Sequence, residues 1–235
     1  MSGLAATLKL DVVRQARSRL YGVGVFIAIV SGLLGRAFFG PEDAGPFLAT
    51  LSLLSLGGTT YIFGASLVLM DKTEGTLSAL RASPLTANAY IASKVVTLTA
   101  FSMIECAIIY AVGFFGTPLD FVSLFGGVAL LGVFYSLLSM GQVAAYDSVF
   151  SFLIPGAMIV GSVTQWPALF VLSIGPPELW YFIPTQGPLL VMLGSSEHLA
   201  TWQWIYALAM SGASITLAAL WAKRRFAHFI GMVER

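Results

Sequence analysis

Six long apolar stretches dominate this chain of 235 residues, and they constrain its fold more than any other feature. A helix needs roughly 20 apolar residues to cross the hydrocarbon core of a bilayer. The chain is 57% hydrophobic and 10% charged, whereas about a quarter of the residues in a soluble domain carry charge. We therefore predict one all-α transmembrane domain over residues 1–235, with six spans at about 21–39, 46–70, 89–116, 121–146, 148–172 and 201–222.

The placement of basic residues predicts the orientation of these spans. Lys and Arg near the ends of spans tend to stay on the cytoplasmic side. With six spans, the connections at about 40–45, 117–120 and 173–200 fall on one side; they contain no Lys or Arg, and they carry several carboxylates. Both termini are then cytoplasmic. The basic residues that share this side are Lys9, Arg14, Arg17, Arg19, Lys72, Arg81, Lys94, Lys223, Arg224, Arg225 and Arg235.

The segment 173–200 is apolar enough in part to resemble a seventh span. A further crossing would move Lys223, Arg224 and Arg225 to the other side, and Pro176, Pro177, Pro184 and Pro188 interrupt helical hydrogen bonding. We expect a re-entrant external segment before span six. The alternative is an ordinary external loop anchored by the aromatic residues 180–182.

The connection between spans two and three is the long polar interruption on the cytoplasmic side. Asp71 and Glu74 have the spacing of an N-cap and its reciprocal partner, and Leu77 and Leu80 form an apolar i, i+3 pair. Pro84 disfavours a helical conformation at the preceding residue. These features predict a short helix of about two turns on the membrane surface, followed by a cap for span three at Thr86 or Asn88.

This connection resembles that of the ABC type-2 export permeases, in which acidic residues precede Gly-Thr-Leu, a further Leu, Ser/Thr-Pro-Leu, and a Ser-Lys where the third span begins. The resemblance implies a coupling helix that docks on an ATPase; a capped surface turn is the alternative from the residues alone. The chain departs from the pattern at Thr73, where a carboxylate is common. The coupling residues implied are Asp71, Glu74, Gly75, Thr76, Leu77, Leu80, Arg81 and Pro84, and Ser83, Leu85, Tyr90, Ser93 and Lys94 also match.

Hydrolysis is expected in a partner chain. The sequence lacks a Gly-x-x-x-x-Gly-Lys-Ser/Thr loop, so we expect ATP and Mg to be bound by a separate ATPase subunit. We expect no catalytic residue, no metal site, no cofactor in this chain and no nucleic-acid partner. Six spans are half of the family's usual twelve, which implies a second permease copy or paralogue.

The resemblance implies a multi-pass subunit of the bacterial plasma membrane that exports an amphiphilic drug or lipid-like molecule. The segment from Trp180 to Leu190 is most similar to that of small bacterial drug-efflux permeases of the fluoroquinolone type. A permease for haem or lipid-linked glycans is an alternative within the family. A membrane scaffold or immunity protein without transport is an alternative from another class.

Ionisable residues inside spans are costly and often functional. Arg36 and Glu105 lie at similar predicted depths, roughly 22 to 24 Å from the cytoplasmic end at 1.5 Å per residue. They could pair, or Arg36 could reach the outer interface while Glu105 stays protonated or faces a cationic substrate. Thr59 and Thr60 could line the same pathway or could bond to helix carbonyls. Pro155 and Pro167 are expected to kink span five.

Overall fold

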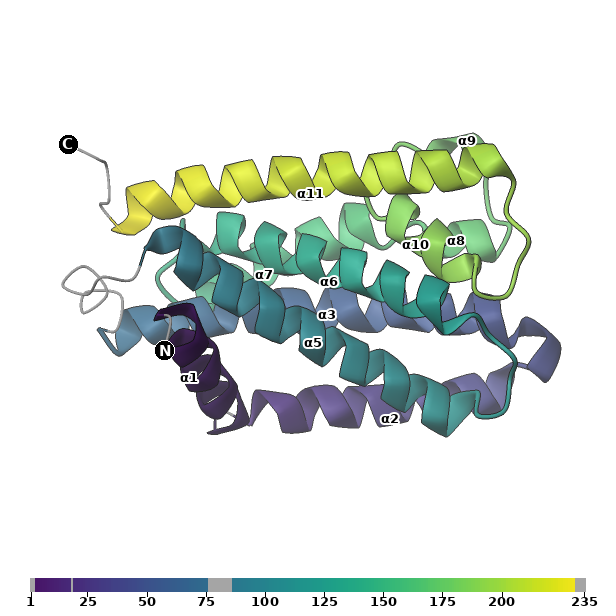
Figure 1. Ribbon diagram of the computed structural model, residues 1–235, viewed down its shortest axis with the longest axis horizontal. Helices are drawn as coiled ribbons and strands as arrows, with labels where there is room; N and C mark the ends of the chain where they lie inside the picture. The colour runs from purple at the N-terminus through teal and green to yellow at the C-terminus, as the bar shows by residue number, and fades with distance from the viewer. Residues whose placement is uncertain (1–2, 18, 76–85, 231–235) are drawn as a thin grey trace.

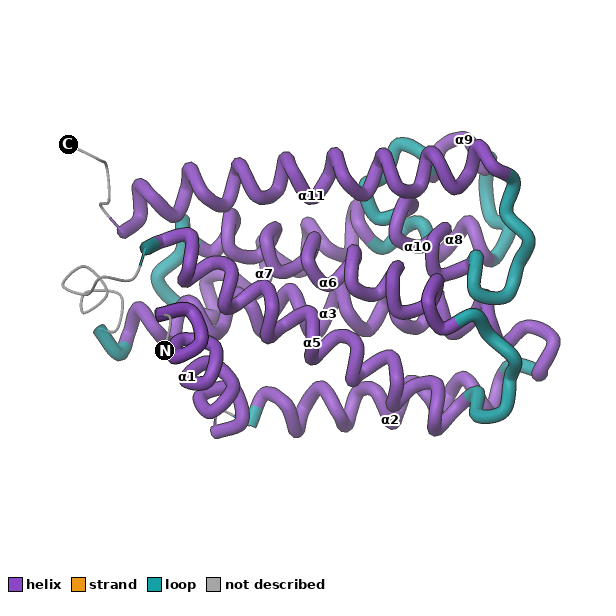
Figure 2. The backbone as a smooth tube through the Cα atoms, in the orientation of Figure 1, coloured by secondary structure: helices purple, strands orange, loops and turns teal. Residues whose placement is uncertain are grey.

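The computed structural model describes residues 3–17, 19–75 and 86–230, and all regular elements in those ranges are helices. Figures 1 and 2 show long helices running side by side, with shorter helices at both ends. The helices are α1 (Gly3–Arg17), α2 (Leu20–Phe38), η1 (Pro41–Asp43), α3 (Ala44–Thr73), α5 (Ala87–Gly113), α6 (Phe121–Val143), α7 (Val149–Ile159), η2 (Val160–Thr164), α8 (Ala168–Val171), α9 (Pro177–Trp180), α10 (Gln186–Leu193) and α11 (Thr201–Ile230).

Six segments of the described chain are long and apolar enough to cross a membrane, as predicted. They are α2, α3, α5, α6, the combined segment Val149–Val171, and α11. The predicted bounds agree closely except at the end of the last span, because α11 continues past 222 to Ile230. Lys223, Arg224 and Arg225 mark the change to a polar surface there, but charged residues do not end a helix.

The core of the bundle is built around α3. Among the candidate spans α3 is the most buried, and it packs against α2, α5 and α6. The helix α6, which packs on α3, also contacts α10 and α11. Glycines let the backbones approach closely where α2 crosses α5, since a Cβ atom on Gly113 would lie 2.5 Å from the carbonyl oxygen of Gly32.

The fifth span is interrupted, in agreement with the predicted kinks. Pro155 lies inside α7, which passes directly into the π-helical turn η2. The chain then breaks at Pro167 before the single turn α8. A proline lacks the N–H group that would bond the preceding turn, and π-helical turns accommodate such interruptions.

The segment 173–200 enters and leaves the bundle at the same end, as expected of a re-entrant segment. It contains α9 and α10 and then leads into α11 (Figure 1). All eight residues of α10 are buried, against α6 and α11, and eight residues are too few to span a bilayer. Of the aromatic residues that would anchor the alternative external loop, Trp180 is buried in the bundle, whereas Phe182 is 81% exposed.

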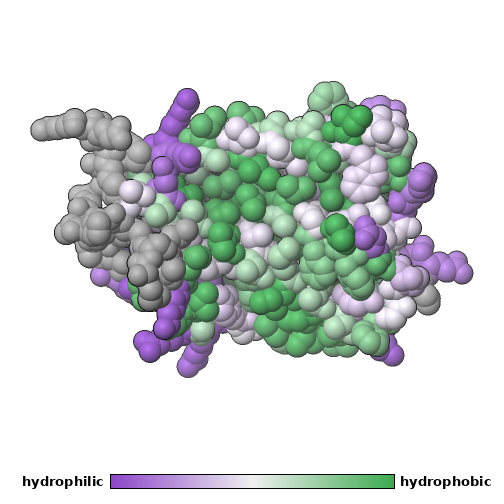
Figure 3. All heavy atoms as spheres, in the orientation of Figure 1, coloured by the Kyte–Doolittle hydropathy of each residue, from purple (hydrophilic) through white to green (hydrophobic). Residues whose placement is uncertain are grey.

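On the face that Figure 3 shows, hydrophilic side chains gather at the two ends of the molecule and apolar side chains cover most of the surface between them. We call the end with α1 and the C-terminal ends of α3 and α11 the basic end, and the end with η1 and α9 the acidic end. Asp120 lies at the acidic end, where the Ser123 hydroxyl and the Val122 N–H donate to it and hold its pKa below the ordinary value. The start of α1 and the end of α11 thus share one end, as an even number of crossings requires.

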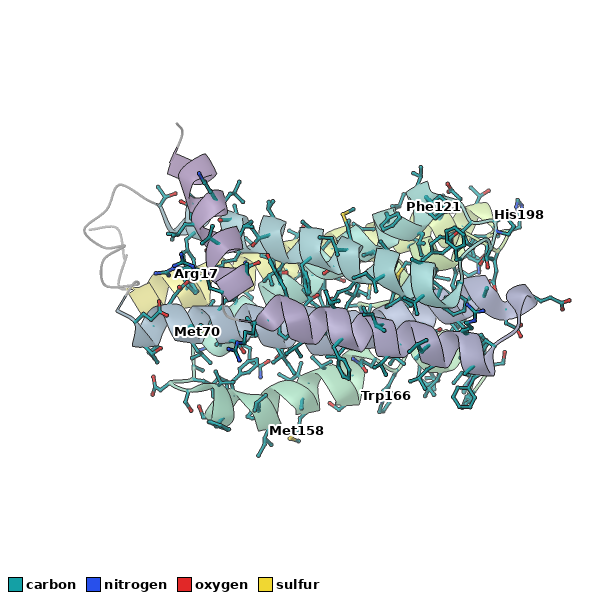
Figure 4. The ribbon with its side chains drawn as sticks, turned by 90° about the horizontal axis from the view of Figure 1, so that it is seen from below. Arg17, Met70, Phe121, Met158, Trp166 and His198 are labelled. Atoms are coloured by element: carbon teal, nitrogen blue, oxygen red, sulfur yellow. The ribbon has the colours of Figure 1, made fainter. Side chains whose placement is uncertain are left out.

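The helix α1 was not predicted as a separate element. It packs against α5 and α2, and a left-handed residue, Arg19 with φ 62°, lies at the start of α2. In Figure 4, α1 leaves the line of α2 and projects from the bundle at the basic end. The first span is therefore preceded by a helix that crosses its direction.

Candidate functional site

The ammonium group of Lys94 joins three helices at the basic end. Its Nζ lies 2.7 Å from Asp11 Oδ1 in α1 and 2.9 Å from Asp71 Oδ2 in α3, while Lys94 itself belongs to α5. The side chains of Lys94, Asp11 and Asp71 are 2%, 6% and 5% exposed, respectively. Buried charges are stable only when each is paired and its remaining hydrogen-bonding positions are filled.

Neighbouring side chains complete this pairing. The Arg14 guanidinium lies 2.7 Å from Asp71 Oδ1, and the Tyr90 hydroxyl donates to Asp71 Oδ2 at 2.6 Å. The Ser93 hydroxyl donates to Asp11 Oδ2 at 2.5 Å. Every carboxylate oxygen of the two aspartates has a donor, and two cations balance two anions. We call Asp11, Arg14, Asp71, Tyr90, Ser93 and Lys94 the ion network.

Helical spacing explains why these residues meet. Asp11 and Arg14 are three residues apart and so share a face of α1. Tyr90, Ser93 and Lys94 occupy i, i+3 and i+4 positions on α5, and Thr97, one turn further, accepts a hydrogen bond from Gln15 at 2.8 Å. The polar face of α1 therefore docks on a polar face at the start of α5.

The ion network includes residues at both ends of the predicted coupling connection. Asp71 lies in the last turn of α3, before the connection, and Tyr90 lies in the first turn of α5, after it. Thr86 caps α5 by accepting from the Ala89 N–H, as predicted. The remaining predicted coupling residues, Thr76, Leu77, Leu80, Arg81 and Pro84, lie outside the described residues.

The expected capping role of Asp71 is wrong. The helix α3 continues to Thr73, so Asp71 lies inside it, and Gly75 follows the helix end with φ 71°. A glycine in this left-handed conformation is a common helix terminator. Asp71 instead forms ion pairs in the network. At the exposed edge of the network, Glu74 Oε2 lies 3.5 Å from Arg14 Nη2.

A second polar cluster lies in the middle of the bundle. Glu105 is fully buried, and the Thr59 hydroxyl donates to its Oε2 at 2.8 Å. The hydroxyls of Thr60 and Ser102 are 2.8 Å apart beside it. Glu105 Oε1 has no hydrogen-bond partner among the described residues. The structure thus brings together Glu105 and Thr59, two of the predicted pathway residues, with Thr60 one residue further along α3.

The structure does not bring Arg36 to Glu105. A Cβ atom on Gly24 would lie 2.7 Å from Glu105 Oε1, so Glu105 is level with Gly24 on α2. Arg36 lies three turns further along the same helix, about 18 Å away at 1.5 Å per residue. It is exposed at the acidic end, in a pocket of about 410 Å³ that Phe39 and Phe114 also line. The pairing alternative assumed that both spans begin at one depth, but α1 displaces the start of α2 to the level of Phe101.

Asp11 and Gln15 were not identified as site residues from the sequence. Asp11 is the one carboxylate in an otherwise basic leader, and Lys94 lies about two turns inside an apolar helix. An isolated acid and an isolated base of this kind are a signal for pairing. The separation of 83 residues between Asp11 and Lys94 prevents their assignment to each other without the fold.

Six apolar segments long enough to cross a membrane, together with buried polar clusters within the bundle, define a multi-pass membrane protein. The chain belongs to the fluoroquinolones export permease protein family, which it matches over residues 2–235. It is 26% identical over 216 residues to a protein described as a fluoroquinolones export permease protein in Mycobacterium tuberculosis strain CDC 1551 / Oshkosh, with 88% of each chain covered. The protein of the same description in strain ATCC 25618 / H37Rv matches to the same extent.

Proposed function

We propose that this chain is the membrane-spanning subunit of an ABC exporter in the bacterial plasma membrane. A separate ATPase subunit binds ATP and Mg and docks on the cytoplasmic connection 76–85, and two permease subunits, identical or paralogous, enclose the pathway. The ion network is the observation that carries this proposal. It ties the last turn of α3 to the first two turns of α5, through the Tyr90 hydroxyl and the buried ion pair of Lys94 with Asp71.

This arrangement suits the transmission of motion. An element that passes a displacement from a soluble partner into a bundle must not yield at its attachment points. Removing one partner of a buried ion pair costs several kcal/mol, about 3 to 5 in measured cases, so the network resists separation of α3 from α5. A push on the connection would then move α1, α3 and α5 together.

The substrate we propose is an amphiphilic aromatic molecule of the fluoroquinolone type, as the names of the two relatives suggest. Such molecules combine a planar ring system with a carboxylate and a basic amine. Glu105 supports a cation-binding step in the pathway, because a buried carboxyl group with one free oxygen is suited to contact an amine.

Co-expression with the candidate ATPase tests the proposal. We expect the purified complex to hydrolyse ATP faster in the presence of a fluoroquinolone, and inverted vesicles to accumulate the drug when ATP is supplied. Leu77→Asp and Leu80→Asp place a charge on the predicted docking face and should abolish the stimulation without affecting membrane insertion. Ser78→Asp, off that face, is the matched control. Full stimulation in both leucine variants would exclude coupling through this face.

A further inference from the structure

An apolar groove of about 630 Å³ lies in the corner between α1, α2 and α5. Its walls come from Val12 of α1, Tyr21 and Val25 of α2, and Val96, Phe101 and Ile104 of α5. It does not coincide with the ion network or with the Glu105 cluster. A volume in this range is typical of sites that hold a small molecule or a lipid chain.

The surroundings of the groove show which medium reaches it. Val96 and Ile104 are 54% and 53% exposed, so the groove opens on the apolar outer surface of α5. On α1, Leu10, Val12 and Val13 are also exposed by 51%, 48% and 40%. The helix α1 projects from the bundle at the basic end (Figure 4), and we expect its apolar side chains to lie where the hydrocarbon of one leaflet begins.

One charged side chain lines this groove. Lys9 is exposed and belongs to α1, at the basic end. None of the carboxylates that the structure describes forms a salt bridge with it. An amine beside an apolar groove complements a molecule with an anionic head and an apolar tail, and anionic lipids are attracted to such residues at a membrane surface.

We propose that this groove holds one anionic phospholipid, with an acyl chain along Val25, Val96 and Ile104 and its phosphate on Lys9. The lipid fills the corner that α1 and the bundle form at the membrane surface. It thereby supports, from the lipid side, the packing of α1 against α5 that the ion network holds together. This inference does not depend on the identity of the exported substrate.

Native mass spectrometry of the detergent-purified full-length chain tests the site. The probes are phosphatidylglycerol and phosphatidylcholine with identical acyl chains. We expect one phosphatidylglycerol to be retained about fivefold more strongly than phosphatidylcholine, the effect of one lysine near an anionic lipid. Lys9→Glu should remove this preference. Lys223→Glu, an exposed lysine of α11 at the same end, is the matched control and should keep it.

A second pair of variants tests the groove itself. Ala100→Trp places an indole in the groove and should reduce retention of both lipids, whereas Ala213→Trp on the exposed face of α11 should not. Circular dichroism and size-exclusion profiles check that each variant is folded. If the Lys9→Glu protein is not folded, Lys9→Gln is used in its place.

Three results would overturn the assignment. They are equal retention of the two lipids by the unmodified chain, a preference that survives at Lys9→Glu, and unchanged retention in Ala100→Trp. A fluoroquinolone that displaces the bound lipid in a one-to-one ratio would also contradict the lipid assignment, and it would identify the groove as a substrate site.

Discussion

Lys94 is the shared cation of the ion network, and its replacement has a defined cost. Lys94→Met leaves Asp11 and Asp71 buried with Arg14 as their remaining cation. We expect the free energy of unfolding to fall by about 3 to 5 kcal/mol, as for other buried pairs that lose one partner. Denaturant unfolding in detergent measures this change, and Lys223→Met at an exposed position should shift it by less than about 0.5 kcal/mol.

The same network offers a rescue. Asp11→Asn in the Lys94→Met background removes one of the uncompensated charges and should recover part of the lost stability, since contacting residues are not additive. A Lys94→Met protein as stable as the unmodified chain would mean that the three helices do not depend on these contacts.

Glu105 and Arg36 are expected to act independently. They are far apart along α2, and distant sites usually add to within about 0.5 kcal/mol. We expect Arg36→Gln and Glu105→Gln to combine additively in thermal stability. We also expect Glu105→Gln to lower efflux of a cationic dye more than efflux of a neutral dye, with Arg36→Gln as the control. Equal losses for both dyes would remove the substrate role of Glu105.

The crossing of α2 and α5 depends on two glycines in contact. A Cβ atom on Gly113 would meet the backbone of Gly32 at 2.5 Å, and backbone cannot move aside as a flexible side chain can. Gly113→Ala should therefore destabilise the bundle by about 1 to 3 kcal/mol through overpacking. Gly212 on α11 has open space around it, so Gly212→Ala should be neutral or stabilising by up to about 1 kcal/mol. Thermal unfolding of the two variants gives the comparison, and equal effects would contradict a close crossing.

The long helices could be predicted because lipid imposes a length and a composition on each of them. Breaks in span five could also be predicted, since Pro155 and Pro167 remove hydrogen bonds whatever surrounds them. Hydropathy predicted the start of the first span, but it did not predict that the basic leader before that span forms the helix α1. The direction of α1 depends on the left-handed backbone of Arg19 and on docking to α5, and local composition does not report either of them.

The two polar sites were predicted to different degrees. Glu105 was identified because an ionisable group inside a span is rare, and Thr59 because it is a polar residue of span two; the structure places them in contact. Two alternatives were left open for Arg36, and the structure has it exposed at the acidic end and not paired with Glu105. The pairing alternative counted depth from the start of each span, but the two spans do not start at the same level. Asp71 was assigned to a new helix because its spacing to Glu74 fits a cap, yet α3 continues to Thr73 and ends before the left-handed Gly75, and Asp71 pairs with Lys94.

The bundle as a whole predicts a sidedness that can be measured. The start of α1 and the end of α11 lie at the basic end, and the connections with Glu42, Asp120 and Glu197 lie at the opposite end (Figure 1). Because basic flanks stay in the cytoplasm, we expect single cysteines at positions 9 and 223 to react with an impermeant reagent only after the membrane is broken. Cysteines at 42, 120 and 197 should react in intact cells. The buried Cys106 should stay unreactive and can be kept. The reverse pattern at 197 would contradict six crossings.

The attachment of α1 through Lys94 has one more consequence. If the ends of α3 and α5 are displaced during ATP turnover, the ion network must carry α1 with them, and α1 borders the lipid along Leu10 and Val13. Its depth in the leaflet should then change with each cycle. An environment-sensitive fluorophore on Leu10→Cys would report nucleotide state optically, from a helix outside the connection on which the ATPase is proposed to dock.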